Sequence, residues 1–514
     1  MNWTAGYASD VEYTAGFYRE QSPVYLNFAC VLNGYEPVPL NRPFTYCELG
    51  FGRGLTVSLQ AAAHPNGQFY ATDFNPGHVA GARNFADAAQ LSNLHLLENS
   101  FEELAKGEVD LPQFDFITLH GIYTWVTREN RAHIAEFIRR YLKPGGIVYM
   151  SYNAMPGWAA ALPMQRLLVE HGDLHPNRSD LQVNAGAQFI EKLAELNAGY
   201  FNVNPSLKSR VEVLKNGSRN YLVHEYMHRH WEPMYHVDVA RDMANAKLDF
   251  IGSADLPFAY HGLYLDAPRQ ELLNSVSNPS MRETVLDYLF NTQFRRDVFV
   301  RGPRRMSPMR QAEWLGQVGV ALLVPRKDVS LQMKLGIGEV NGKEESYGPV
   351  LDALAEKPMT LEELGRLPKL QGQTYGNLTQ IATMLFASNQ VGLYFNHAKT
   401  PSGEAAKRLN RVLAQQVRYS DEWQALASPL LGNGVSANYM ERMVYLIISA
   451  QPKFANDLTS LVNEAWRMMS AQGRRMMREG KPLESAEENQ RELAAQIDAV
   501  LMKRLPIWRS LLMI

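Results

Sequence analysis

Tyr46-Cys47-Glu48-Leu49-Gly50-Phe51-Gly52-Arg53-Gly54 places three closely spaced glycines directly after a short apolar run. Glycine suits such a position because it accepts positive φ angles and lets the backbone approach a bound molecule closely. The run FTYCEL (44–49) predicts a strand, and residues 55–63 predict a helix. The glycines are therefore expected to form the turn between the first strand and the first helix of an α/β fold.

The residues around this turn distinguish between the cofactors that it can serve. Dinucleotide enzymes and methyltransferases both use a glycine-rich turn here. A dinucleotide fingerprint has Gly or Ala at position 55 or one residue later, whereas this chain has Leu55 and Thr56. Glu48 would repel a pyrophosphate, but it suits a cation such as the amino group of a methionine moiety. No lysine follows in the Walker arrangement, so a phosphate-binding loop is not expected.

Strand and helix signals alternate from this turn to residue 152. Further strands are predicted at 68–74, 94–100, 114–120 and 147–152, with helices at 79–89 and 129–142. Lys143-Pro144-Gly145-Gly146 is expected to turn the chain into the last of these strands. Strands separated by helices of this length indicate a parallel, doubly wound, Rossmann-like sheet.

Polar and aromatic residues end the second and third strands, at the edge where open α/β sheets bind ligands. Asp73 is a candidate to accept hydrogen bonds from two ribose hydroxyls, and the alternative is a helix N-cap. Phe74 is expected to lie against an adenine or in the core. The predicted cofactor site consists of Glu48, Gly50, Gly52, Gly54, Asp73, Phe74, Asn99, Ser100, Phe101 and His120.

The fourth and fifth strands each run into an aromatic loop, HGIYTWV (120–126) and YNAMPGW (152–158). Aromatic rings at this edge can hold a sulfonium by cation–π attraction and exclude water, and core packing is the alternative for each ring. Methyl transfer to nitrogen needs a deprotonated amine, a straight approach and a dry pocket more than a strong base. The predicted catalytic residues are His120, Tyr123, Trp125, Tyr152 and Asn153, although His120 alone also fits a hydrogen-bonded structural residue.

The segments around this core suggest further parts. Residues 1–45 are rich in aromatics and are expected to form a helical lid over the site or to pack on the next domain. Residues 158–234 are predicted to be a helical insertion into a domain of residues 46–265, whose last strands are expected within 234–256. A middle α+β region, 266–345, contains the basic cluster FRRDVFVRGPRR (294–305), which is expected to be a solvated loop or a site for an anionic partner.

Two parts are expected towards the C-terminus. Residues 346–400 show three helices followed by the strand VGLYF (391–395), the order of a winged-helix-like module. Thr360 and Glu363 fit a capping box within it. This module has no arginine-rich helix, so it is expected to contact protein and not DNA. Residues 401–514 are predicted to be an all-α region.

Length, charge and cysteine content exclude several classes of protein. The chain has 514 residues, 46% of them hydrophobic, which allows about three domains with large cores. Its 51 Lys+Arg balance 53 Asp+Glu, so a globally basic nucleic-acid binder is excluded and no nucleic-acid partner is expected. Two cysteines, Cys30 and Cys47, exclude a disulfide scaffold and a four-cysteine zinc site, and no metal is expected. Neither a signal peptide nor a membrane span is recognised, so a cytoplasmic location is expected.

The order of the motifs resembles class I S-adenosylmethionine-dependent methyltransferases: ExGxGxG at 48–54, then Asp73, then KPGG at 143–146. More narrowly, HGIYTWV and SYNAMPGW (151–158) resemble the methyltransferases that carry a methyltransferase regulatory domain, among them the rickettsial outer-membrane-protein lysine methyltransferases. Residues 224–256 resemble the regulatory-domain signature, which the family places near 216–300. The spacing Tyr7…Tyr13…Pro23 resembles the start of that family.

The resemblance implies S-adenosylmethionine as the cofactor. The leading hypothesis is methyl transfer to an amine, lysine above all, of a protein substrate, with the second half of the chain choosing or docking that protein. The chain departs from the family at Phe51–Leu55 and at Gln21-Ser22-Pro23, where the family has Thr-His-Pro. Two alternatives stay open: a small-molecule methyltransferase whose C-terminal half forms an oligomer such as a homodimer, and a binding or scaffold protein with a methyltransferase fold.

Overall fold

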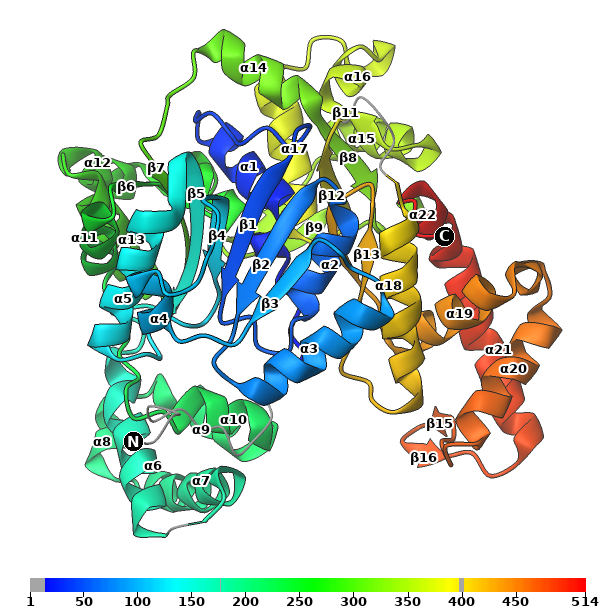
Figure 1. Ribbon diagram of the computed structural model, residues 1–514, viewed down its shortest axis with the longest axis horizontal. Coiled ribbons are helices and arrows are strands. Elements are labelled where there is room, and N and C mark those ends of the chain that lie inside the picture. The colour runs from blue at the N-terminus through cyan, green and yellow to red at the C-terminus, as the bar shows by residue number, and fades with distance from the viewer. Residues whose placement is uncertain (1–13, 176, 397–401) are drawn as a thin grey trace.

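The computed structural model describes residues 14–175, 177–396 and 402–514, and a seven-stranded sheet lies at its centre (Figure 1). The strands are β1 (Phe44–Leu49), β2 (Gly67–Thr72), β3 (Leu94–Leu97), β4 (Phe114–Leu119), β5 (Leu142–Asn153), β6 (Leu248–Ser253) and β7 (Phe294–Arg301). Their order is β3-β2-β1-β4-β5-β7-β6. The five strands β1 to β5 are parallel, and β7 is antiparallel to both of its neighbours, β5 and β6. The predicted Rossmann-like α/β fold is confirmed.

The last two strands of the sheet come only in part from the segment that the sequence indicated. Of the segment 234–256 only β6 joins the sheet, and Met234 makes an isolated bridge to Ala154. The strand between β5 and β6 is β7, which belongs to the segment that we expected to be a solvated basic loop of the middle region. That expectation was wrong because the β7 residue Arg295 is buried and forms ion pairs with three carboxylates, so its charge is no sign of a surface position.

Helices cover both faces of the sheet. One face packs against α1 (Pro23–Leu32), α2 (Leu55–Ala63) and α3 (Pro76–Ala88). The other packs against α4 (Phe101–Lys106), α5 (Arg128–Tyr141) and α11 (His236–Asn245). The turn predicted at Lys143–Gly146 appears as an irregularity inside β5, where the register against β4 shifts and Gly145 has a φ of +79°.

Helices fill the segment between β5 and α11, and they project away from the sheet (Figure 1). They are α6 (Leu162–Leu174), α7 (Ser179–Glu195), α8 (Gly199–Val203), α9 (Leu207–Asn216) and α10 (Arg219–Tyr226). Their apolar faces form a separate core around Met164, Leu168 and Leu222, which Trp125 joins from the loop after β4.

A second, smaller sheet follows β7 in the chain. Two helices, α12 (Ala267–Ser275) and α13 (Pro279–Phe290), still precede β7. The elements after it are α14 (Pro308–Gln317), β8 (Val318–Leu322), β9 (Gln332–Leu335), β10 (Gly338–Asn341), α15 (Glu344–Glu356), β11 (Met359–Thr360), α16 (Leu361–Gly365), α17 (Tyr375–Ala387) and β12 (Val391–Phe395). The small sheet has the order β11-β8-β12. Its central strand β8 comes from the segment that we assigned to the middle region, and Thr360 and Glu363 form the predicted capping box.

The described C-terminal residues are mainly helical, but they also contain short strands, so the prediction of an all-α region is correct only for the helices. The helices are α18 (Glu404–Gln415), α19 (Tyr439–Ala450), α20 (Leu458–Ser470), α21 (Ala486–Lys503) and α22 (Leu505–Ser510). Two short hairpins join them, β13 (Ala425–Ser428) with β14 (Asn433–Ser436) and β15 (Met477–Arg478) with β16 (Lys481–Pro482). Across the residues described, no helix combines the length and the apolar character that a membrane crossing requires.

Candidate functional site

The glycine turn between β1 and α2 has the backbone geometry that only glycine adopts easily. Gly50, Gly52 and Gly54 have φ angles of +73°, +57° and +78°. A Cβ on Gly50 would lie 2.4 Å from Cδ1 of Ile122, in the loop after β4. The turn is tied to β2, because the Gly50 amide donates to the carbonyl of Thr72 at 2.8 Å. The predicted role of these glycines as a close-approach turn therefore fits their positions.

Glu48, the last residue but one of β1, is buried directly before this turn. Its carboxylate is 3% exposed and accepts a hydrogen bond from Nε2 of Gln21 at 3.3 Å. Within the described residues, Oε2 of Glu48 and Oε1 of Gln21 are both buried without a hydrogen-bond partner. Burial raises the pKa of Glu48 to about 8, against the hydrogen bond from Gln21 and together with the charge of Asp73. Two buried acceptors without a donor are the arrangement that an ammonium group completes.

Gln21 was not predicted as a site residue. It lies in the short 3-10 turn Arg19–Gln21, next to Ser22, whose side chain caps α1. The sequence Gln21-Ser22-Pro23 signals the start of a helix, and that signal hides the contact of Gln21 with Glu48, 27 residues further along the chain. The expected lid over the site lies partly outside the described residues, which exclude 1–13 and with them Tyr7 and Tyr13. The part from Tyr18 to Gln21 does lie at the site.

Asp73 follows β2 and holds the glycine turn in place. Oδ2 accepts a hydrogen bond from the Gly52 amide at 2.9 Å, and Oδ1 accepts one from the Asn75 amide at 2.9 Å. Nδ1 of His78 lies 3.2 Å from Oδ1. The N-cap of α3 is Asn75, so the alternative role that we considered for Asp73 is not the one it has. A carboxylate has about four acceptor positions, which leaves room on Oδ2 for a ribose hydroxyl.

The residues after β3 lie next to Asp73 along the same edge. The hydroxyl of Thr72 donates to the carbonyl of Asn99 at 3.0 Å, which joins the ends of β2 and β3. Ser100 caps α4 in a capping box with Glu103, so its hydroxyl is already used. Phe74 and Phe101 are half-buried. The structure thus brings together all the residues predicted for the cofactor along one edge, with Ser100 in a structural role.

The register of the sheet divides the predicted catalytic residues between its two faces. Glu48 is paired with Thr118, Thr118 with Tyr149, and Tyr149 with Val298, so these side chains share one face. Asn153 is four residues after Tyr149 on β5 and lies on the same face, whereas Tyr152 lies on the opposite one. Nδ2 of Asn153 is buried and has no hydrogen-bond partner among the residues that the structure describes.

His120 lies on the Glu48 face, in a chamber of aromatic rings. The Tyr18 ring stacks on the imidazole with 3.7 Å between ring centroids, and the hydroxyl of Tyr149 lies 2.9 Å from Nδ1. The ring of Phe294, the first residue of β7, has its centroid 5.9 Å from that of the imidazole. Because β7 is antiparallel, its start meets the carboxyl ends of β4 and β5. We call His120, Tyr18, Tyr149 and Phe294 the aromatic chamber.

Charged groups surround the chamber without giving it a strong base. Burial, with the positive charge of Arg296, lowers the pKa of His120 to about 3, so the imidazole is neutral at physiological pH. Nε of Arg296 lies 3.9 Å from Oε1 of Glu20. Burial, and after it the negative charge of Glu20, raises the pKa of Tyr149 well above its ordinary value. The chamber therefore suits a reaction that needs positioning and exclusion of water more than proton transfer to a side chain.

Tyr123 and Trp125 lie outside the chamber. The Tyr123 hydroxyl donates to Asp242 of α11 at 2.9 Å, and its ring is fully buried with Val239 and Met243. Trp125 stacks on Trp231 with 5.8 Å between ring centroids, as part of the core of the helical insertion. For both residues the core-packing alternative describes the observed position.

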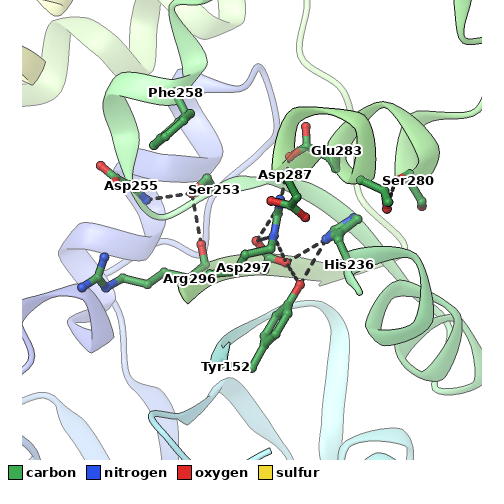
Figure 2. Close-up of polar contacts among 12 residues, drawn as sticks. Tyr152, His236, Ser253, Asp255, Phe258, Ser280, Glu283, Asp287, Arg296 and Asp297 are labelled. Carbon is green, nitrogen blue, oxygen red and sulfur yellow. Dashed lines mark hydrogen bonds and ion pairs between the residues drawn. The ribbon is translucent and has the colours of Figure 1, made fainter. Parts of the chain in front are cut away.

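Tyr152 belongs to a buried polar cluster on the opposite face of the sheet (Figure 2). Its hydroxyl donates to Oδ2 of Asp297 at 2.5 Å, and Nδ1 of His236 lies 2.9 Å from the same oxygen. Arg295 completes the cluster with ion pairs to Asp297 and Asp287. Figure 2 shows Arg296 leaving β7 in the direction opposite to this cluster. The cluster ties β5, β7, α11 and α13 together, which is a structural role.

Among the described residues, no group of three or more His, Cys, Asp and Glu side chains is placed to hold a metal ion. The groups at the site suit an organic cation instead. They are the buried oxygen acceptors of Glu48 and Gln21, the carboxylate of Asp73 and the aromatic rings beside His120.

Comparison with known proteins identifies the class. A methyltransferase-domain model matches residues 47–146, and a model described as a predicted methyltransferase regulatory domain matches residues 218–301. The structure of PKMT2 from Rickettsia typhi in complex with AdoHcy has the same fold, with a TM-score of 0.70 at 16% identity over 95% of this chain and 98% of that one. The chain is a class I S-adenosylmethionine-dependent methyltransferase with a regulatory domain.

A relative of the same length defines the family. Protein sll1526 of Synechocystis is 39% identical over 520 residues, which cover 99% of each chain. Protein RP789 of Rickettsia prowazekii is 20% identical over 96% of this chain and 92% of its own. The chain belongs to the family of sll1526.

Proposed function

We propose that this methyltransferase transfers a methyl group to an amine, lysine above all, of a protein substrate. The observation that carries the proposal is the aromatic chamber beside the cofactor edge, with a neutral His120 between the rings of Tyr18 and Tyr149. An amine nucleophile needs alignment and exclusion of water more than a strongly basic side chain, and the aromatic rings around a neutral imidazole suit that requirement. The similarity of fold to PKMT2 along nearly the whole chain supports a macromolecular substrate, because the second half of the chain is shared as well.

The cofactor, when bound, supplies an electrophilic methyl group on a sulfonium. Glu48 and Gln21, which have buried oxygens without a partner in the described structure, would accept hydrogen bonds from its amino group, and Asp73 would accept them from its ribose. Glu48 and Tyr149 are two strands apart on one face, a separation of about 10 Å, so the chamber lies beyond Glu48 along the edge. Tyr18, Tyr149 and Phe294 exclude water there and attract a cationic acceptor.

His120 and Asn153 position the acceptor. The neutral imidazole accepts or donates a single hydrogen bond through its second nitrogen, since Nδ1 contacts Tyr149. Asn153 offers a buried donor at the end of β5 on the same face. A cationic acceptor would first lose a proton to water, which gives its nitrogen the lone pair that attack requires. The neutral amine would then bond to the methyl carbon as the bond from that carbon to sulfur breaks, and the electron pair of that bond would stay on sulfur.

Labelling with radioactive S-adenosylmethionine in cell extract tests the proposal. We expect the purified protein to label polypeptides, and acid hydrolysis of them to release methylated lysine. A Glu48→Gln variant is the control, since it removes the negative charge opposite the amino group at nearly unchanged volume. Label that appears only in small molecules would exclude a protein substrate.

A further inference from the structure

We propose that Glu20 is the recognition group for a cationic acceptor, and that Arg296 occupies the position of that cation until the acceptor enters. This inference rests on the proposed transfer to an amine and adds the residue that selects it. Neither residue was predicted from the sequence as part of the site, and neither belongs to the cofactor contacts described above.

The position of Glu20 points to this role. It lies between Tyr18, which stacks on His120, and Gln21, which contacts Glu48. The backbone that closes the chamber therefore carries Glu20 to the junction of the chamber and the cofactor edge. The Glu20 side chain is 18% exposed and that of Arg296 is 34% exposed, so solvent reaches this pair beside the chamber.

The ion pair between Glu20 and Arg296 is loose. Its shortest nitrogen–oxygen distance is 3.9 Å, at the limit of direct contact, whereas the pairs that fix Arg295 on the opposite face measure 2.8 to 3.0 Å. Nε of Arg296 is buried and donates no hydrogen bond within the described part of the chain. A loosely paired, partly exposed arginine can swing away from its carboxylate at little cost, whereas the bonded Arg295 cannot.

The remaining groups favour a cation over an anion as the occupant. Asp255 is a second carboxylate whose charge acts on Arg296, and Tyr25 and Tyr149 face the same pair. The ring of Phe294 lies 5.1 Å from the guanidinium of Arg296, which shows that the chamber wall already accepts a positive group. An alkylammonium chain of the length of a lysine side chain combines the positive charge that Glu20 selects with an apolar stem that can pack on aromatic rings.

Binding of n-butylammonium, which mimics the end of a lysine side chain, tests this inference without a methylation assay. The protein is first saturated with S-adenosylhomocysteine, and binding is followed by ligand-observed NMR. We expect Glu20→Gln to weaken the binding of butylammonium about tenfold, because a charge-assisted contact is lost. We expect Arg296→Gln to strengthen it several-fold, because the competing cation is removed. Glu129→Gln, at an exposed carboxylate on α5, is the charge-matched control and should change nothing.

Two results would overturn the inference. One is equal binding, or none at all, of butylammonium to the wild type and to Glu20→Gln. The other is preferential binding of n-butyrate that Arg296→Gln abolishes, because Arg296 would then be the recognition group for an anion. Binding of S-adenosylhomocysteine is measured for each variant and should stay unchanged.

The same variants separate this inference from the proposed function. With a lysine peptide as substrate, Glu20→Gln should raise KM and leave kcat nearly unchanged. If butylammonium binds as expected but no lysine in peptide or protein is methylated, the proposed function fails while the recognition of a cation stands. If lysine is methylated with the same KM by Glu20→Gln and the wild type, the recognition role fails and the proposed function stands.

Discussion

The ionisation of Glu48 is disfavoured by burial in the free protein, whereas the positively charged amino group of the cofactor would favour it. Burial raises its pKa to about 8, so at pH 7 the free protein holds it mainly as the neutral acid. The amino group of the cofactor is a cation that pairs with the ionised form. Binding therefore has to remove a proton from Glu48, and the cost of this step falls as the pH approaches 8.

We predict that the affinity for S-adenosylmethionine rises with pH, roughly tenfold between pH 6 and 7, and levels off near pH 8. The sign follows from Glu48, whose raised pKa places its ionisation in this range. Titration calorimetry at pH 7 in buffers of different ionisation enthalpy should reveal the release of close to one proton. Glu48→Gln should bind more weakly and release none. An affinity independent of pH in the wild type would contradict this account of the site.

Tyr152 and Asn153 are adjacent, yet they should respond oppositely to substitution. Tyr152→Phe removes a hydrogen bond to a buried carboxylate, so we expect a loss of stability of about 1.5–3 kcal/mol with turnover nearly unchanged. Asn153→Ala removes a donor without a protein partner in the described structure, so we expect stability to change by less than about 1 kcal/mol and turnover to fall. Thermal unfolding and initial rates measure the two effects. Equal loss of turnover in both variants would place Tyr152 at the site after all.

At the scale of elements, the strands β1 to β5 could be predicted because each is an apolar run bounded by turn residues or a helix. β7 could not, because Arg295, Arg296 and Asp297 give it the composition of a surface loop. Only the three-dimensional structure shows that Arg295 and Asp297 neutralise each other inside the protein. The same limit applied to Gln21 and Glu20, since contacts across the fold leave no local pattern in the sequence.

Gly50, in the turn from β1 to α2, and Gly121, in the loop after β4, separate the effect of close packing from the effect of backbone conformation. Gly50→Ala faces both a positive φ and a Cβ only 2.4 Å from Ile122, whereas Gly121→Ala faces a positive φ of +63° with open space around it. We expect each to lose about 1–2 kcal/mol from backbone strain, and Gly50→Ala to lose more and to weaken cofactor binding. Adding Ile122→Ala should recover the steric part alone. Melting curves and calorimetry provide the comparison, and equal losses at both glycines would argue against a steric role for Ile122.

At the scale of the whole molecule, the length beyond the catalytic sheet has a structural consequence. Every residue of α2 from Leu55 to Ala63 is buried, although one face of a helix beside a sheet normally meets solvent. The second face of α2 packs against α18, β13 and β14 of the C-terminal part. The hydroxyl of Ser22 donates to the carbonyl of Gly432, and Arg408 donates to the carbonyl of Ala89. The core of the catalytic sheet and that of the C-terminal part are continuous.

We therefore predict that the methyltransferase domain does not fold without the C-terminal part. A chain ending at residue 401 would expose the apolar face of α2 and leave the hydroxyl of Ser22, which lies directly before α1, without its partner. It should aggregate or melt far below the full chain and fail to bind S-adenosylhomocysteine. A full-length variant with Arg408→Ala is the milder comparison, since it removes only the contacts with the carbonyls of Ala89 and Gln90 and should still fold. If the shortened chain is soluble and binds the cofactor product normally, the C-terminal part is an independent appendage and the catalytic domain does not depend on it.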